Sequence, residues 1–150
     1  SANAPGRFNV MDYRGATIIA DYGHNPDAIR ALVQAVDAMP GNKRSVVISG
    51  AGDRRDQDII EQTRILGAAF DEVILYQDAC QRGRADGEVL ALLRQGLEGA
   101  PRTRYSTEIH GEFAAIDHAL ERLAPGDLCL VLVDQVEEAL AHLQQRIASA

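Results

Sequence analysis

The segment DYGHNP at 21–26 brings together side chains that could form a binding or reaction site. It follows a run of apolar and β-branched residues at 16–20, which predicts a buried strand. Asn25 suits the N-cap of a following helix and Pro26 suits its first position. The Asp21 carboxylate could accept hydrogen bonds from a ribose or hold a cation, and the first-turn N–H groups could receive an anion. The alternative is an N-capped turn in which Asp21 only satisfies backbone donors.

A second polar loop, GAGDRRD at 50–56, follows a short apolar run at 45–49 that predicts another strand. Its two glycines lack the third glycine of the dinucleotide-binding fingerprint, because Arg55 stands at that position. The chain also lacks GxxxxGK[ST], so it has no phosphate loop of its own. Arg54 and Arg55 between two aspartates are typical either of a solvated charge cluster or of a guanidinium facing a phosphate or carboxylate.

A third polar loop carries RGR at 82–84 and follows the apolar run at 73–76. It leads into a helix that we expect to begin near Glu88. A charged surface loop is the simpler interpretation of Arg82 and Arg84, and contact with an anionic group is the alternative.

Metal and hydrolase chemistry have little support. The histidines show neither HxxxH spacing nor a cysteine partner at ligand spacing, so we predict no metal site. The alternation of Glu108, His110 and Glu112 is a weak indication to the contrary. A GxSxG nucleophile elbow is absent from the sequence.

The remaining pattern is an alternation of strands and helices. A strand carrying Phe8 and Val10, with Arg14 and Gly15 as a turn, is expected to form a hairpin with the strand at 16–20. Further strands are predicted at 45–49, 73–76, 103–109 (a short edge strand) and 128–133, and helices from 26, at 58–70, at 88–97, and around 113–123 and 136–147. This order predicts a Rossmann-like three-layer α/β sandwich, mostly parallel, with an N-terminal antiparallel hairpin strand.

The predicted fold gives the polar loops a common location. In open α/β sheets, ligands bind beyond the carboxyl ends of the strands. Four segments follow those ends: the loops at 21–26, 50–56 and 77–84 and the pair at 134–135. The loops that enter the strands carry fewer charged residues and glycines. The sequence therefore predicts one site-bearing rim.

Composition narrows the class of protein. With 150 residues, 46% of them hydrophobic, residues 5–150 fit one domain, and residues 1–4 look like a linker end or a cloning remnant. A net charge of −7 argues against a nucleic-acid partner. No apolar run approaches membrane-spanning length and no signal peptide is visible, so no membrane partner is expected. Cys129, in an apolar run, is expected to be a buried reduced thiol, as in a cytoplasmic protein.

These motifs also carry a family resemblance. Gly6 and Arg7, the hairpin, and DYGHNP at 21–26 resemble the entry to the C-terminal domain of the Mur ligase superfamily, and GAGDRRD at 50–56 is similar to its glycine-rich loop. GDRRD, RGR at 82–84 and the ending LVDQVEEAL at 132–140 look most like the cyanophycin synthetase family. Position 23 holds Gly where many relatives carry Ala, a mild departure.

The resemblance implies an ATP-dependent amide ligase that activates a carboxylate as an acyl phosphate. It implies that Arg7 and Asp21 reach the nucleotide, and that His24 and Asn25 lie in the reaction cleft. Asp53, Arg54, Arg82 and Arg84 would then lie around the substrate. ATP and Mg²⁺ would be held mainly by a central ATPase domain of the same polypeptide, so this chain alone is not expected to be catalytic.

The implied substrates are an amino acid, arginine in the cyanophycin synthetase family, and a poly-aspartate-type acceptor. Another Mur-type ligase, acting on peptidoglycan precursors or folylpolyglutamate, is the alternative enzyme. A free-standing Rossmann-like nucleotide-binding or interaction module is the non-enzymatic alternative. Homo-oligomerisation is left open.

Overall fold

A computed structural model describes residues 3–50, 54–77 and 83–150. Six strands form one sheet in the order β1-β2-β6-β3-β4-β5. All neighbours are parallel except β1 and β2. The strands are β1 (Asn9–Tyr13), β2 (Ala16–Asp21), β3 (Arg44–Ile48), β4 (Glu72–Gln77), β5 (Tyr105–His110) and β6 (Leu128–Leu132). The predicted parallel sheet with an antiparallel hairpin strand is confirmed.

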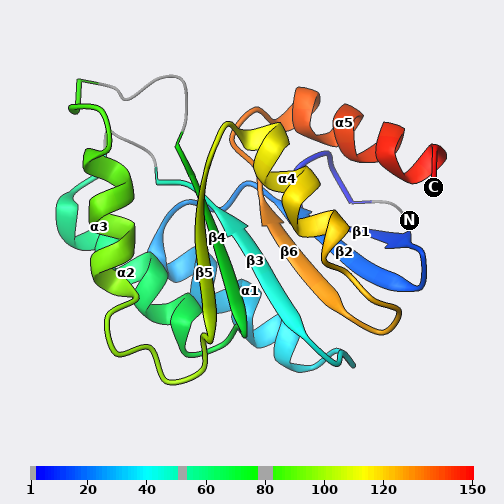
Figure 1. Ribbon diagram of the computed structural model, residues 1–150, viewed down its shortest axis with the longest axis horizontal. Helices are drawn as coiled ribbons and strands as arrows, with labels where there is room; N and C mark the ends of the chain where they lie inside the picture. Colours follow the sequence, from blue (N-terminus) through cyan, green and yellow to red (C-terminus); the bar gives the residue numbers. More distant parts are fainter. Residues whose placement is uncertain (1–2, 51–53, 78–82) are drawn as a thin grey trace.

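Helices cover both faces of the sheet (Figure 1). One layer contains α1 (Pro26–Asp37), α2 (Asp56–Gly67) and α3 (Glu88–Gly96), and the other contains α4 (Glu112–Glu121) and α5 (Val136–Ala148). Alternate strand residues feed the two cores: Ile19 and Leu130 face the first layer, whereas Ile18 and Val131 face the second. The three-layer sandwich is therefore as predicted.

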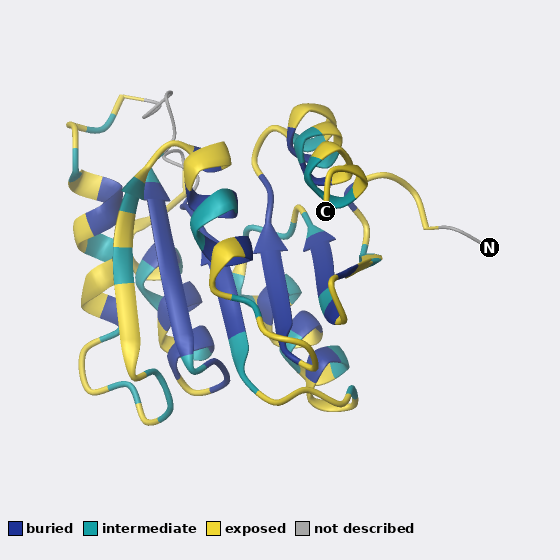
Figure 2. Cartoon of the chain, turned by 45° about the vertical axis from the view of Figure 1, so that its right-hand side comes forward, coloured by how far each residue is buried: buried dark blue, intermediate teal, exposed yellow. Residues whose placement is uncertain are grey.

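Burial follows position in the sheet. All five residues of β6 are buried, because the strand lies between β2 and β3 and is covered by a helix layer on each face of the sheet. β5 is largely exposed, and Figure 2 shows it as a yellow edge beside the dark central strands. The expected edge strand is thus confirmed, although it begins at Tyr105 rather than at 103.

The first hairpin differs from the expectation in phase. Its turn is as predicted, with positive φ at Arg14 and Gly15, as a two-residue type I′ turn requires. The strand begins at Asn9, and Phe8 lies outside it with φ 46°. Val10 faces solvent while Met11 and Tyr13 pack on the second core. The prediction that the strand carries Phe8 was wrong, because Phe8 belongs to the preceding loop, whereas Val10 lies in the strand as predicted.

The helix boundaries in the structure differ from the predicted ones by a few residues. The helix predicted at 58–70 spans Asp56–Gly67, and Phe70 follows it as a fully buried residue. Cys129 is a fully buried free thiol, as expected. Within the described ranges, no helix has both the length and the apolar character needed to cross a membrane.

Candidate functional site

The carboxyl ends of β2, β6 and β3 lie side by side. After β2 the chain continues into α1 on one face of the sheet, and after β6 it continues into α5 on the other. Neighbouring strands whose helices leave to opposite faces create a crevice where ligands bind in open α/β sheets. The loop at 21–26 and the segment at 132–135 line this position.

Asp21 holds the loop that carries Arg7. Its Oδ2 accepts a hydrogen bond from Phe8 N at 2.9 Å and its Oδ1 accepts one from Gly23 N at 2.8 Å. Tyr22 N donates to Gly6 O at 3.0 Å. Both carboxylate oxygens therefore already receive backbone donors, and Asp21 fixes the course of the chain on either side of the crevice.

Arg7 is exposed and lines a cavity of about 570 Å³. Its guanidinium carbon is 4.8 Å from the centre of the Tyr22 ring, which is a cation–π distance. Asp21, His24 and Arg54 also line the cavity. Asn25 lines it as well, so the structure brings together five of the eight predicted site residues.

His24 points back into the protein at the floor of this site. Its Nε2 lies 3.0 Å from Val133 O, and because a carbonyl can only accept, Nε2 carries the hydrogen. Burial lowers the pKa of His24, and the nearby Arg54 cation acts in the same direction. Nδ1 is buried without a hydrogen-bond partner among the described residues. The lowered pKa favours the neutral imidazole, and no described residue uses the Nδ1 lone pair.

Asn25 caps α1 as predicted. Its Oδ1 accepts from Ala28 N at 2.9 Å, and Pro26 occupies the first helical position. From the α2 side, the buried Gln62 amide donates to His24 O. The start of α1 is consequently fixed both by its own cap and by the adjacent helix.

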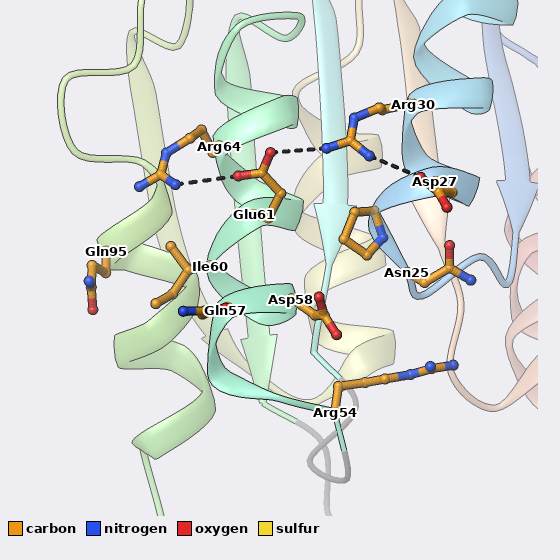
Figure 3. A pocket seen from close by; sticks show the side chains of 11 residues that line it. Asn25, Asp27, Arg30, Arg54, Gln57, Asp58, Ile60, Glu61, Arg64 and Gln95 are labelled. Carbon is orange, nitrogen blue, oxygen red and sulfur yellow. Dashed lines mark hydrogen bonds and ion pairs between the residues drawn. The ribbon is translucent and has the colours of Figure 1, made fainter.

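A second cavity, of about 820 Å³, adjoins the first along α1 and α2. Figure 3 shows Glu61 between Arg30 and Arg64, with ion pairs of 3.1 and 3.3 Å. Asn25 and Arg54 line both cavities. The Arg54 side chain makes no ion pair or hydrogen bond with the described residues, so its charge is available to a ligand at the junction.

Arg84 is engaged with the protein itself. Its guanidinium makes an ion pair with Asp56 at 2.8 Å, pairs with Glu88, and donates to Arg54 O at 2.7 Å. These hydrogen bonds to carboxylates raise the pKa of Arg84. Arg84 therefore links the start of α2 to the start of α3 and supports the segment of Arg54.

Two predicted substrate residues, Asp53 and Arg82, lie outside the described residues. In the described ranges, no group of three His, Cys, Asp or Glu residues could hold a metal ion.

Glu112 supports the backbone beside the site from the α4 side, a role that the sequence did not reveal. It is the first residue of α4 and is 5% exposed. Its Oε2 accepts from Asp134 N at 2.7 Å and its Oε1 accepts from Gln135 N at 3.2 Å. Burial raises the pKa of Glu112, and the two backbone hydrogen bonds oppose that rise. A glutamate directly after Gly111 at a helix start was the available signal, but its spacing with His110 suggested a metal ligand instead.

The chain is similar in sequence to cyanophycin synthetases along nearly its whole length. It is 32% identical to that of Crocosphaera subtropica over 147 residues and 34% identical to that of Synechocystis sp. over 143 residues. These matches cover 97% and 95% of the chain but only 17% and 16% of the relatives. A UDP-N-acetylmuramoyl-L-alanyl-D-glutamate–2,6-diaminopimelate ligase of Zymomonas mobilis is 33% identical over 81% of the chain and 24% of that ligase.

Solved structures share the fold. A UDP-N-acetylmuramoyl-L-alanyl-D-glutamate–2,6-diaminopimelate ligase superposes with TM-score 0.81 at 22% identity, covering 99% of this chain and 32% of its own. E. coli FolC in complex with ADP superposes with TM-score 0.75 at 21% identity, covering 98% and 33%. The profile of the Mur ligase glutamate ligase domain matches residues 6–133. The chain therefore belongs to the Mur ligase family and corresponds to the C-terminal, glutamate ligase domain of its members.

Proposed function

We propose that the chain is the C-terminal domain of an ATP-dependent amide ligase of the cyanophycin synthetase type. In this proposal the enzyme joins arginine to the side-chain carboxylates of a poly-aspartate backbone through an acyl phosphate. The observation that carries it is identity of 30–34% to five cyanophycin synthetases over 94–97% of the chain. Because the chain spans about a sixth of those relatives, the activity belongs to the larger polypeptide.

The fit of a nucleotide rests on two guanidinium groups. Arg7 and Arg54 line the same cavity, and neither has an ion-pair partner among the described residues. Cations on a cavity wall suit phosphate oxygens. When bound, ATP supplies the phosphoryl group that activates the acceptor carboxylate. Since the described residues offer no acidic metal site, we assign Mg²⁺ to the central domain.

The protein side of the reaction follows from the groups at the crevice. Arg7 and Arg54 bind phosphates or a substrate carboxylate, and Asp21 holds the Arg7 loop in place. His24 lines the cavity, and its buried Nδ1 would have to become exposed on domain closure to accept a hydrogen bond from the incoming amine. Asp53, Arg82 and Arg84 remain proposed substrate contacts, and Arg84 would have to exchange one of its acidic partners to reach a ligand. Closure of this domain over the central one brings the reactants together and excludes water from the acyl phosphate.

The choice of amino acid tests the proposal. The intact ligase is given ATP, an aspartate-backbone primer and one amino acid at a time, and phosphate release is followed. Arginine should stimulate release most, and lysine less, because lysine lacks the planar fork of the guanidinium. If glutamate or a diamino acid is preferred and arginine has no effect, the enzyme is another Mur-type ligase.

Substitutions at the crevice test the site. In the intact ligase, Arg7→Ala or Asp21→Asn should lower turnover by about 10- to 1,000-fold through lost charge-assisted contacts. The matched control is Arg14→Ala, because Arg14 makes the same kind of contact with Tyr13, at 5.3 Å, at the opposite end of the hairpin. Near-normal kinetics for both crevice variants would show that Arg7 and Asp21 are only structural.

A further inference from the structure

Four consecutive residues at the end of β6 have their backbone groups bound from two opposite sides. From the α4 side, the Tyr76 hydroxyl donates to Leu132 O at 2.9 Å, and Glu112 accepts from Asp134 N and Gln135 N. From the β2 side, Val133 N donates to Asp21 O at 2.8 Å, and Val133 O accepts from His24. The segment at 132–135 therefore lies between two sets of partners.

One peptide unit joins these two sets. Val133 O and Asp134 N belong to the same amide, so Glu112 binds one end of it and His24 binds the other. A peptide unit is planar, and its N–H and C=O cannot turn independently. Any rotation that releases Asp134 N from Glu112 must also turn the carbonyl away from His24.

The contact with Glu112 also changes the charge distribution within this amide. At 2.7 Å, the bond from Asp134 N to the carboxylate is at the short end of the range for N–H donors. A negative charge at the N–H end polarises the amide and makes its carbonyl oxygen a stronger acceptor. A stronger acceptor at Val133 O favours the imidazole form that carries its hydrogen on Nε2, which leaves the lone pair on Nδ1.

We propose that Glu112 is a positioning residue that sets the orientation and tautomer of His24 through the Val133–Asp134 peptide unit. The role in catalysis rests on the proposed function, in which Nδ1 of His24 accepts a hydrogen bond from the incoming amine. Glu112 lies on the side of the amide opposite to His24 and acts without touching the substrate. Tyr76 supports the same segment one residue earlier, at Leu132 O.

Three substitutions separate this role from a merely structural one. Glu112→Gln keeps an oxygen for Asp134 N but removes the charge. Glu112→Asp keeps the charge but withdraws it by about one bond, ~1.5 Å. The matched control is Glu72→Gln, because Glu72 is also a buried carboxylate, 1% exposed, and lies at the amino-terminal end of β4, where Lys43 and Arg122 pair with it.

The first measurement is the tautomer of His24 from imidazole ¹⁵N spectra of the 150-residue chain. The unsubstituted chain and Glu72→Gln should show hydrogen on Nε2. Glu112→Gln should shift His24 toward the Nδ1–H form, and Glu112→Asp should give a smaller shift of the same sign. A folded Glu112→Gln chain with an unchanged ring overturns the proposal. If that variant does not fold, an unchanged ring in Glu112→Asp overturns it.

The second measurement is steady-state kinetics of the intact ligase. Glu112→Gln should lower kcat by about 10-fold, the lower end of what loss of a histidine-orienting partner costs at metal sites. KM for ATP and for the amino acid should stay within about twofold, because Glu112 lines neither cavity. Glu72→Gln should leave kcat unchanged. A tautomer shift without loss of kcat would uphold the link from Glu112 to His24 and refute instead the proposed part of His24 in catalysis.

Discussion

Gly96, the last residue of α3, is where a normally favourable substitution should be destabilising. Replacing glycine by alanine inside a helix usually stabilises it by about 1 kcal/mol. Here, a Cβ on residue 96 would lie 2.1 Å from Ile60 O and 2.1 Å from Thr63 Oγ1. Ordinary contact begins near 3.4 Å, so α3 would have to move away from α2 by more than an ångström.

The size of the effect follows from two opposed contributions. Overpacking a filled site costs about 1–3 kcal/mol, and the upper end applies because one obstacle is backbone. After subtraction of the helix-propensity gain, Gly96→Ala should lower the free energy of unfolding by about 2 kcal/mol. For a domain of this size that corresponds to roughly 4–8 °C in Tm.

Circular dichroism gives both numbers, the free energy from chemical denaturation and Tm from a thermal melt, with Ala91→Gly as the control. Ala91 is exposed in the same helix, so its replacement should lose only the propensity term, about 1 kcal/mol. A Gly96→Ala chain that is as stable as the parent, or more stable, would show that the two helices are not packed as closely as described.

Three further outcomes follow from buried ionisable groups. Burial raises the pKa of Cys129 to about 11. When the native chain is treated with an alkylating reagent at pH 8, peptide mapping should therefore find Cys129 unmodified, and alkylation at the rate of the unfolded chain would contradict its burial. Arg122→Met removes one of the two cations that pair with the buried Glu72. It should lower the free energy of unfolding by about 1–2 kcal/mol, because Arg122 is partly exposed and Lys43 remains. An unchanged free energy in a urea titration would count against the ion pair. The pKa of His24 is lowered in the folded chain, so the unfolded chain binds the proton more readily. The contribution of the neutral ring to the free energy of unfolding is therefore complete above pH 6.5 and is lost as the pH falls below that value. The stability difference between the chain and His24→Gln, measured from pH 7.5 to 5, should therefore shrink on acidification, and a constant difference would refute the burial of a neutral ring.

The sequence predicted the fold because its signals are local. Periodicity located the helices and buried strands, and Asn25 with Pro26 identified the start of α1 from short-range chemistry alone. The hairpin phase could not be read in this way, because Phe8 is apolar for a reason outside the strand: it packs against the first core from a loop with positive φ.

The site was harder to predict because its contacts cross the sheet. The pattern placed Asp21, His24 and Arg54 on one rim, and the structure brings them around one cavity. Nothing local indicated that Glu112 binds the backbone at 134–135, since the two segments lie on either side of β6 and only the tertiary fold joins them.

The place of β6 in the sheet has a consequence for how the chain folds. Thr17 pairs with Leu128, and Val46 pairs with Leu130, so the strand that joins the hairpin to β3 comes near the end of the chain. Until residue 132 has left the ribosome, β2 and β3 have no strand between them, and their apolar faces stay partly open. Such long-range pairing makes folding slow, because the entropy of closing the loop is lost before any contact forms. During synthesis the chain should therefore depend on chaperones until β6 is inserted, and truncation before β6 should leave two aggregation-prone partial sheets instead of a smaller domain.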